Sequence, residues 1–189
     1  MVELFKNNTM TFVAGSSWQP DEDLFIEYFN QHPEVKLIIA PHVIDENHLV
    51  EIIRKLKRPY VRYTRADEKN VRKADCLIVD CFGLLSSIYR YGEIAYIGGG
   101  FGVGIHNTLE AAVYGIPVIF GPKYQKFQEA VQLLEAKGAF SVKDYEELKT
   151  LLDRMLTDEV FLRESGMNAS NYVTGNAGAT DKIMSMINF

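Results

Sequence analysis

Short apolar runs alternate with segments of helical periodicity along most of the 189 residues. The candidate strands are Thr11–Ala14, Val35–Ala40, Tyr60–Tyr63, Cys76–Val79, Ile94–Ile97, Pro117–Phe120 and Ala139–Val142. Between two of them, Asp45–Leu56 begins with a capping residue and places Leu49, Ile52 and Leu56 on one stripe, as an amphipathic helix does. Apolar strands that alternate with helices indicate a mainly parallel sheet covered on both faces. The pattern therefore predicts a doubly wound α/β domain.

Residues 1–189 fit one domain, because 47% hydrophobic residues can bury a large core. Residues 145–189 carry helical patterns and no further strand, so we expect them to be packing helices of the same domain. A break is expected near Ser165-Gly166, and a loose stretch at 174–178. Three apolar residues close to the C-terminus are expected to belong to the core, namely Ile183, Met184 and Ile187.

The formal net charge of −5 leaves no basic footprint, so nucleic-acid binding lacks its usual electrostatic support. Lys and Arg residues nevertheless gather between positions 54 and 73. A solvated helix face with its flanking loops is the preferred interpretation of this segment, and a surface for acidic lipids is the alternative.

The two cysteines, Cys76 and Cys81, flank a predicted strand. An extended strand would hold them about 16 Å apart, which is too far for a disulfide, so we expect reduced thiols. The sequence has no signal peptide and no apolar run long enough to cross a bilayer, and a cytosolic location is expected. The cysteines and histidines show no zinc spacing, so no metal site is expected.

Residues 98–104 are rich in glycine and lie between a predicted strand and a predicted helix. Asn107 is a suitable N-cap for that helix, whose first free N–H groups carry partial positive charge. Glycines leave no side chain between the backbone and a ligand, and His106 can donate a hydrogen bond to phosphate. The junction therefore indicates an anion site, and the alternative is a tight turn that binds nothing.

Two common phosphate motifs do not fit this loop. The dinucleotide fingerprint requires its last glycine where Val103 or Ile105 stands, so NAD is not favoured. A P-loop requires Gly-Lys followed by Ser or Thr, and residues 105–107 are Ile-His-Asn, so ATP hydrolysis is not favoured either.

Polar or glycine-containing segments follow several predicted strands at their carboxyl ends. These segments are Gly15–Asp21, Pro41-His42, Asp80–Leu84 and the glycine loop. Each has a simple structural alternative, since Ser17 and Asp21 can cap a helix and Phe82-Gly83 can form a turn. Because ligands of open α/β sheets bind beyond the carboxyl ends of the strands, the convergence indicates a nucleotide-type cleft.

Several motifs together resemble the C-terminal domain of 3-deoxy-D-manno-octulosonic acid (Kdo) transferase. They are Gly15-Ser-Ser-Trp, Pro41-His42, Asp80-Cys-Phe-Gly-Leu-Leu with Tyr89, and the stretch from Gly104 to Pro122. The sequence departs from the family by lacking an arginine between Pro41 and His42. Leu84, Ile105 and Thr108 replace a glutamate, a glycine and a proline. The resemblance covers nearly the whole chain and implies a Rossmann-like C-terminal domain of a GT-B glycosyltransferase.

The resemblance also implies roles for individual residues. The glycine loop from Gly104 to Asn107 would hold the CMP phosphate, Glu110 would accept from ribose hydroxyls, and Phe82-Gly83 would lie near the cytosine. Ser16, Ser17 and Trp18 would border the sugar or the domain interface. The predicted substrate-binding residues are Ser16, Ser17, His42, Phe82, Gly83, Gly104, Ile105, His106, Asn107, Thr108 and Glu110.

Such enzymes transfer Kdo from CMP-Kdo onto lipid A precursor in lipopolysaccharide biosynthesis, with no separate cofactor. The resemblance implies that the acceptor-binding N-terminal domain, the membrane anchor and the general base precede the matched segment. It also implies that this segment is a cytoplasmic domain, and that the parent enzyme lies at the cytoplasmic face of the inner membrane. We therefore expect no catalytic residue in these 189 residues and no transfer by them alone. The alternatives are the donor domain of another GT-B glycosyltransferase or epimerase that uses a UDP- or GDP-sugar, and a non-catalytic interaction module.

Overall fold

The computed structural model describes residues 1–176, and it contains all seven predicted strands. They are β1 Met10–Ser17, β2 Val35–Pro41, β3 Tyr60–Arg62, β4 Cys76–Ile78, β5 Ile94–Ile97, β6 Val118–Phe120 and β7 Ala139–Ser141. The α-helices are α1 Val2–Lys6, α2 Gln19–Gln31, α3 Glu46–Lys55, α4 Glu68–Val71, α5 Leu85–Ile88, α6 Leu109–Ala112, α7 Gln128–Glu135, α8 Tyr145–Thr157 and α9 Glu159–Asn176. Two short 3₁₀ helices are η1 Tyr63–Arg65 and η2 Tyr89–Tyr91.

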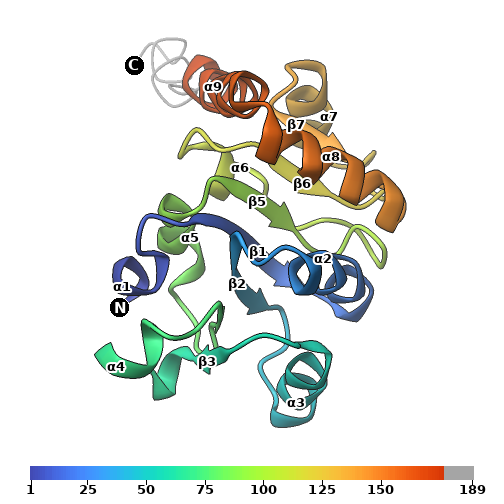
Figure 1. The fold of residues 1–189 in the computed structure, drawn as a ribbon. Helices are drawn as coiled ribbons and strands as arrows, with labels where there is room; N and C mark the ends of the chain where they lie inside the picture. The colour runs from blue at the N-terminus through green and yellow to red at the C-terminus, as the bar shows by residue number, and fades with distance from the viewer. Residues whose placement is uncertain (177–189) are drawn as a thin grey trace, which may run out of the picture.

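The strands form one parallel sheet in the order β3-β4-β2-β1-β5-β6-β7 (Figure 1). β1 lies inside the sheet between β2 and β5, and the chain winds outward from it in both directions. The predicted doubly wound α/β fold is therefore confirmed. The winding reverses between β1 and β5, which is the place where such sheets bind ligands.

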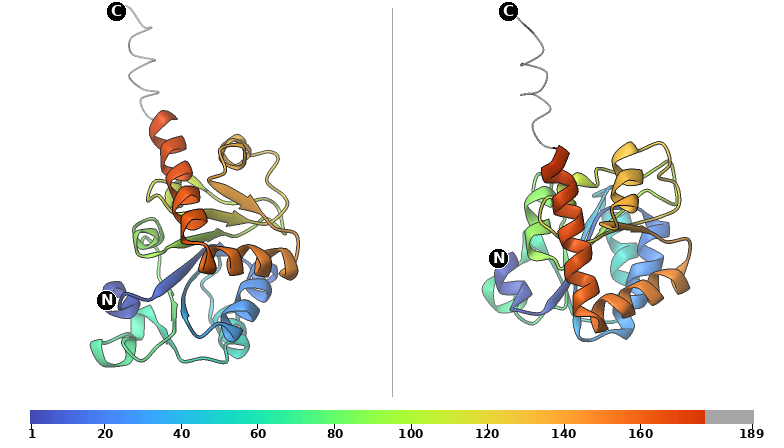
Figure 2. Two further views of the ribbon diagram at one scale, coloured as in Figure 1. Left: turned by 45° about the horizontal axis from the view of Figure 1, so that its top comes forward. Right: turned by 90° about the horizontal axis from the view of Figure 1, so that it is seen from above.

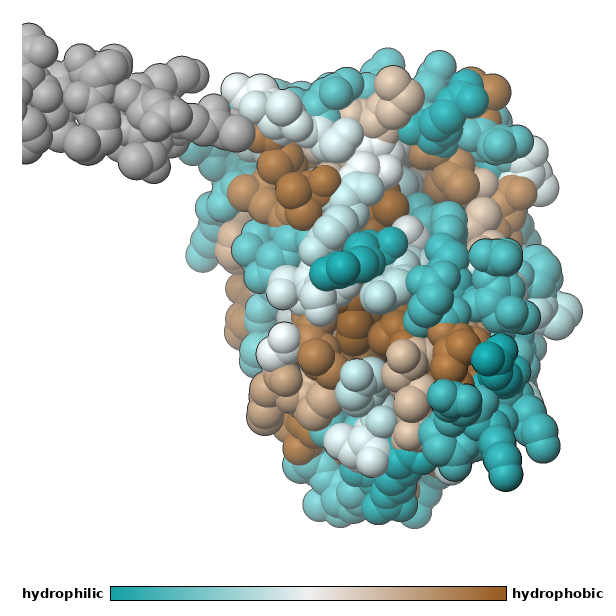
Figure 3. All heavy atoms as spheres, turned by 90° about the vertical axis from the view of Figure 1, so that its left-hand side faces the viewer, coloured by the Kyte–Doolittle hydropathy of each residue, from teal (hydrophilic) through white to brown (hydrophobic). Residues whose placement is uncertain are grey.

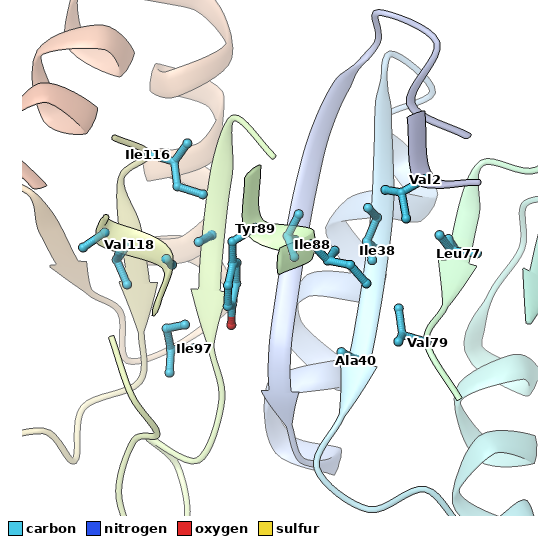
Figure 4. Close-up of a cluster of buried hydrophobic side chains, with 14 of the residues drawn as sticks. Val2, Ile38, Ala40, Leu77, Val79, Ile88, Tyr89, Ile97, Ile116 and Val118 are labelled. Atoms are coloured by element: carbon cyan, nitrogen blue, oxygen red, sulfur yellow. The ribbon is translucent and has the colours of Figure 1, made fainter. Parts of the chain in front are cut away.

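Two buried clusters cover the two faces of the sheet. Neighbouring residues of one strand point into different clusters, as Leu37 and Ile38 of β2 do, which explains why the strands read as continuous apolar runs. Figure 4 shows one cluster, which extends across the sheet from Val118 past Tyr89 to Ile38 and includes Val2 of α1. Helices α2, α3 and α8 contribute to the other cluster (Figures 1 and 2).

Helix α3 begins as its sequence predicts. The Asp45 carboxylate accepts hydrogen bonds from the N–H groups of Asn47 and His48, at 3.0 and 3.1 Å. Leu49 and Ile52 are buried against the sheet, whereas most of the other face is exposed. A side-chain cap and one apolar face therefore account for this helix.

The prediction of a helix break near Ser165-Gly166 is wrong, because α9 runs without interruption through both residues (Figure 2). Gly166 allows a close approach instead: a Cβ atom there would stand 2.2 Å from the carbonyl oxygen of Gly115. The helix also includes residues 174–176 of the stretch predicted to be loose. The remainder of that stretch and the predicted core residues Ile183, Met184 and Ile187 lie outside the described residues.

The basic segment 54–73 follows the edge of the sheet around β3. Arg58 pairs with Asp75 at 3.5 Å, and Arg62 pairs with Glu46 at 2.8 Å, so part of its charge is neutralised locally. Figure 3 shows that the end of the molecule that carries α4 is hydrophilic.

The cysteine prediction is confirmed, since Cys76 is buried, Cys81 is half-buried and both are free thiols. None of the helices in residues 1–176 combines the length and the apolarity that a bilayer crossing requires.

Candidate functional site

The candidate site begins where β1 and β5 end side by side. The N–H of Gly98 donates to the carbonyl of Gly15 at 2.9 Å, and Ser16 has a left-handed backbone with φ of 52° in a bulge of β1. A Cβ atom at Gly98 would stand 2.3 Å from the carbonyl oxygen of Ser16. The two loops are therefore in backbone contact at the switch point of the sheet.

The glycine loop after β5 is held in one conformation by its own hydrogen bonds. The N–H groups of Gly102 and Gly104 both donate to the carbonyl of Gly99, and the N–H of His106 donates to that of Gly98. Gly99 has φ of 94°, and a Cβ atom there would stand 2.3 Å from the carbonyl oxygen of Gly104. The loop folds back on itself into a tight, internally bonded turn.

The loop leads into α6, whose first turn is organised by Asn107. The Asn107 Oδ1 accepts from the N–H of Leu109 at 3.0 Å, and its Nδ2 donates to Oε1 of Glu110 at 3.2 Å. Within residues 1–176, the N–H groups of Asn107 and Thr108 donate to no other group. Two backbone donors at the start of the helix thus remain for an anion.

Three aromatic side chains from three loops stack beside this turn. Trp18 stacks on His42 with ring centroids 4.6 Å apart, and His42 stacks on His106 at 4.4 Å. The Nε1–H of Trp18 donates to Nε2 of His106 at 3.3 Å, which leaves Nδ1 as the protonated nitrogen of a neutral His106. Burial lowers the pKa of His106, the neighbouring His42 lowers it further, and Asp21 opposes both effects.

Four predicted site residues line one pocket of about 230 Å³ beyond β1, β2 and β4. Ser16, His42, Phe82 and Gly83 contribute to its wall, together with Pro41. The Phe82 side chain is 83% exposed, and a Cβ atom at Gly83 would meet nothing within 4 Å. The pocket therefore offers an aromatic ring and accessible backbone to a flat ligand group.

The structure does not place every predicted residue at the surface of the site. Ser17 is fully buried, and its hydroxyl donates to Oε1 of Glu22 at 2.9 Å, so the predicted ligand contact through this side chain is wrong. The side chains of Ile105 and Thr108 are 4% and 3% exposed, and Gly104 is buried with its Cα facing the Phe127 ring. Gly104, Ile105 and Thr108 can therefore offer only backbone groups to a ligand.

Sequence reasoning missed the part that Asp80 plays. Its buried carboxylate accepts from the N–H and the hydroxyl of Thr64, at 2.9 and 2.6 Å, and from Nε of Arg62 at 2.8 Å. Asp80 immediately precedes the loop that carries Phe82 and Gly83. Asp80 therefore anchors one wall of the pocket. An acidic residue directly after a buried strand is the sequence feature that could have indicated this role.

Asp80→Asn is expected to lower the free energy of unfolding by about 2 kcal/mol at neutral pH. Burial raises the pKa of Asp80, but the hydrogen bonds from Thr64 and Arg62 outweigh it and hold the pKa below 3.8. A lowered pKa contributes stability above pH 3.8, which is lost as the pH falls through the folded value. Urea denaturation should thus show a smaller difference between the two proteins near pH 3 than at pH 7. Glu51→Gln, on an exposed surface, is the matched control and should change stability by less than about 0.5 kcal/mol.

Comparison with known proteins identifies relatives of this site and fold. No protein-family model matches the chain. A 3-deoxy-D-manno-octulosonic acid transferase from Aquifex aeolicus is 35% identical over 151 residues, covering 77% of this chain and 41% of the relative. The chain is a homologue of the Kdo transferases.

One further relative and one solved structure are also similar to the chain. A bifunctional glycosyltransferase/methyltransferase from Fusobacterium nucleatum is 30% identical over 173 residues, which are 86% of this chain and 27% of the relative. The crystal structure of the C-terminal CMP-Kdo binding domain of WaaA from Acinetobacter baumannii has a TM-score of 0.77 at 19% identity. That match covers 90% of this chain and 92% of the domain.

The chain spans about two fifths of the length of the Aquifex Kdo transferase. Its fold is the Rossmann-like α/β fold of a GT-B C-terminal domain, as the resemblance implied. In the part of this Kdo transferase homologue that the structure describes, no three His, Cys, Asp or Glu side chains are grouped to hold a metal ion.

Proposed function

We propose that the chain is the CMP-Kdo donor-binding half of a Kdo transferase that glycosylates lipid A precursor in lipopolysaccharide biosynthesis. The observation that carries the proposal is the adjacency of three features: two unused N–H donors at the start of α6, the stacked histidines and the pocket at Phe82. The names of the relatives, Kdo transferase and CMP-Kdo binding domain, support the choice of donor.

In this proposal, the parts of the site bind different parts of the nucleotide. The CMP phosphate accepts from the N–H groups of Asn107 and Thr108 and from Nδ1–H of His106. The cytosine lies in the pocket against Phe82 and the backbone of Gly83, and Glu110 accepts from ribose hydroxyls. Glu110 is suited to this role because Asn107 holds its carboxylate beside the first turn of α6.

The chemical contribution of these residues is stabilisation of the departing CMP. Transfer of the sugar leaves negative charge on the phosphate, and fixed N–H donors stabilise developing charge without reorganisation. Inverting transfer also requires a base that removes the proton of the acceptor hydroxyl. The Aquifex relative is longer than the segment that this chain matches. We assign the base, the lipid A precursor site and the inner-membrane contact to an N-terminal domain of the parent enzyme. Turnover by the 189 residues alone would contradict this division.

Calorimetric titration of the chain with CMP, UDP and AMP at matched concentrations tests the donor assignment. We expect CMP to bind at least about tenfold more tightly than UDP or AMP, because base-specific hydrogen bonds that are left unpaired cost about 1–3 kcal/mol. A preference for UDP would contradict the assignment to CMP-Kdo and favour another GT-B donor domain. Absence of binding to all three nucleotides would favour a non-catalytic module.

A further inference from the structure

Asp21 is a buried acid that contacts the candidate site from behind. It lies in the first turn of α2 and is 1% exposed. Its Oδ2 accepts from the N–H of Gly99 at 2.9 Å and from the N–H of Trp18 at 3.0 Å, and its Oδ1 accepts from the hydroxyl of Tyr96 at 2.9 Å. One carboxylate therefore joins the glycine loop, the turn before α2 and strand β5.

These contacts define where two ligand-facing groups stand. Gly99 closes the turn of the glycine loop, because its carbonyl accepts from two N–H groups farther along the loop. Trp18 carries the indole that stacks on His42 and donates to His106. A shift of either backbone segment would change the contact between Trp18 and His106.

The charge of Asp21 also acts on His106. Three donors and no acceptor point at the carboxylate, an arrangement that suits the ionised form, although burial raises the pKa of Asp21. A negative charge favours the protonated form of His106, against the neighbouring His42 and the burial of the ring. The other acid at this turn, Glu22, bonds to Ser17 and His48 instead.

We propose that Asp21 is a positioning residue for the nucleotide site, which fixes the glycine loop against the Trp18 turn and thereby holds His106 in place for a nucleoside monophosphate. The inference rests on the proposed function, because it assigns the ligand of His106. It adds a buried residue, 1% exposed, that acts through its neighbours.

Asp21→Asn tests the proposal in the full chain, because it keeps the shape of the side chain and removes the charge and one acceptor. In the ligand-free protein, NMR titration should show a lower pKa of His106 and a shifted Gly99 amide. Binding of CMP should weaken by about tenfold, because the glycine loop and the Trp18 turn no longer hold the ligand donors in place. Ser17→Ala is the control, since it removes a buried hydroxyl that bonds to Glu22 and not to the glycine loop.

An unchanged His106 titration together with an unchanged Gly99 amide in Asp21→Asn would overturn the proposal. If the variant does not fold, the wild-type protein still decides: the Gly99 amide must follow the titration of the Asp21 carboxyl, and an insensitive amide would overturn it. Absence of CMP binding to the wild type would refute the proposed function separately, whereas the ligand-free titrations would still report whether Asp21 controls the loop.

Discussion

Gly98→Ala is expected to lower the free energy of unfolding by about 4 kcal/mol or more, the largest effect of any substitution considered for this chain. A Cβ atom at Gly98 would stand 2.3 Å from the carbonyl oxygen of Ser16 and 2.5 Å from Cα of Ser17. Both atoms belong to the backbone of β1, which pairs with β2 on one side and β5 on the other. Backbone atoms in a packed interior cannot give way as the end of a flexible side chain can.

Urea denaturation of Gly98→Ala measures this effect, with Gly175→Ala as the matched control. A Cβ atom at Gly175, near the end of α9, would meet nothing within 4 Å, so that variant should be as stable as the parent or slightly more so. A loss below about 1 kcal/mol in Gly98→Ala would mean that the contact between the two loops is looser than described.

His106→Ala combined with Asn107→Ala is expected to weaken CMP binding about 100-fold. The first substitution removes the imidazole donor, and the second removes the amide that caps α6 and holds Glu110. Hydrogen bonds to charged groups contribute about 1.5–3 kcal/mol each, and the remaining backbone donors account for residual binding. Calorimetric titration with CMP measures the change.

His32→Ala is the control for this double variant. His32 follows α2 and precedes β2, so it lies near the amino-terminal ends of the strands, away from the candidate site. Its ring stacks on Tyr28. It should leave the CMP affinity unchanged. Unchanged affinity in a folded double variant would instead place the nucleotide elsewhere on the molecule, so thermal unfolding of each protein is measured alongside.

The strands could be predicted from the sequence because their pattern is local. Leu37, Ile38 and Ile39 are all completely buried, and only a strand covered on both faces accommodates such a run. The helix that begins after Asp45 could be predicted because its signals are also local. The capping residue and the buried residues Leu49 and Ile52 lie within about two helical turns of one another.

The features that the sequence could not supply depend on contacts between distant segments. Ser17 was expected to face a ligand, yet it points inward because Glu22 and His48 form a polar pair beneath it. A glycine inside a helical pattern predicts a break at Gly166, whereas its role is contact with Gly115, about fifty positions earlier in the chain. Asp21 does contribute to the cap of α2, as the structural alternative has it, but nothing local indicates that Gly99 also donates to its carboxylate.

The glycine loop illustrates the same distinction within the site. Its sequence predicted a ligand site because glycine leaves the backbone open. The structure shows that several of these glycines are needed for contact between backbone segments, as between Gly100 and Gly121, where a Cβ atom would stand 2.6 Å from backbone atoms. The donors left for a ligand belong to Asn107 and Thr108, which follow the glycines.

The most direct test of the account is a two-dimensional amide NMR titration of the chain with CMP. We expect selective shifts at residues 102–110 and at Phe82-Gly83, the two sides of the cleft beyond β1 and β5. Shifts confined to another surface, or no shift at saturating CMP, would contradict a nucleotide site at the carboxyl edge of this sheet.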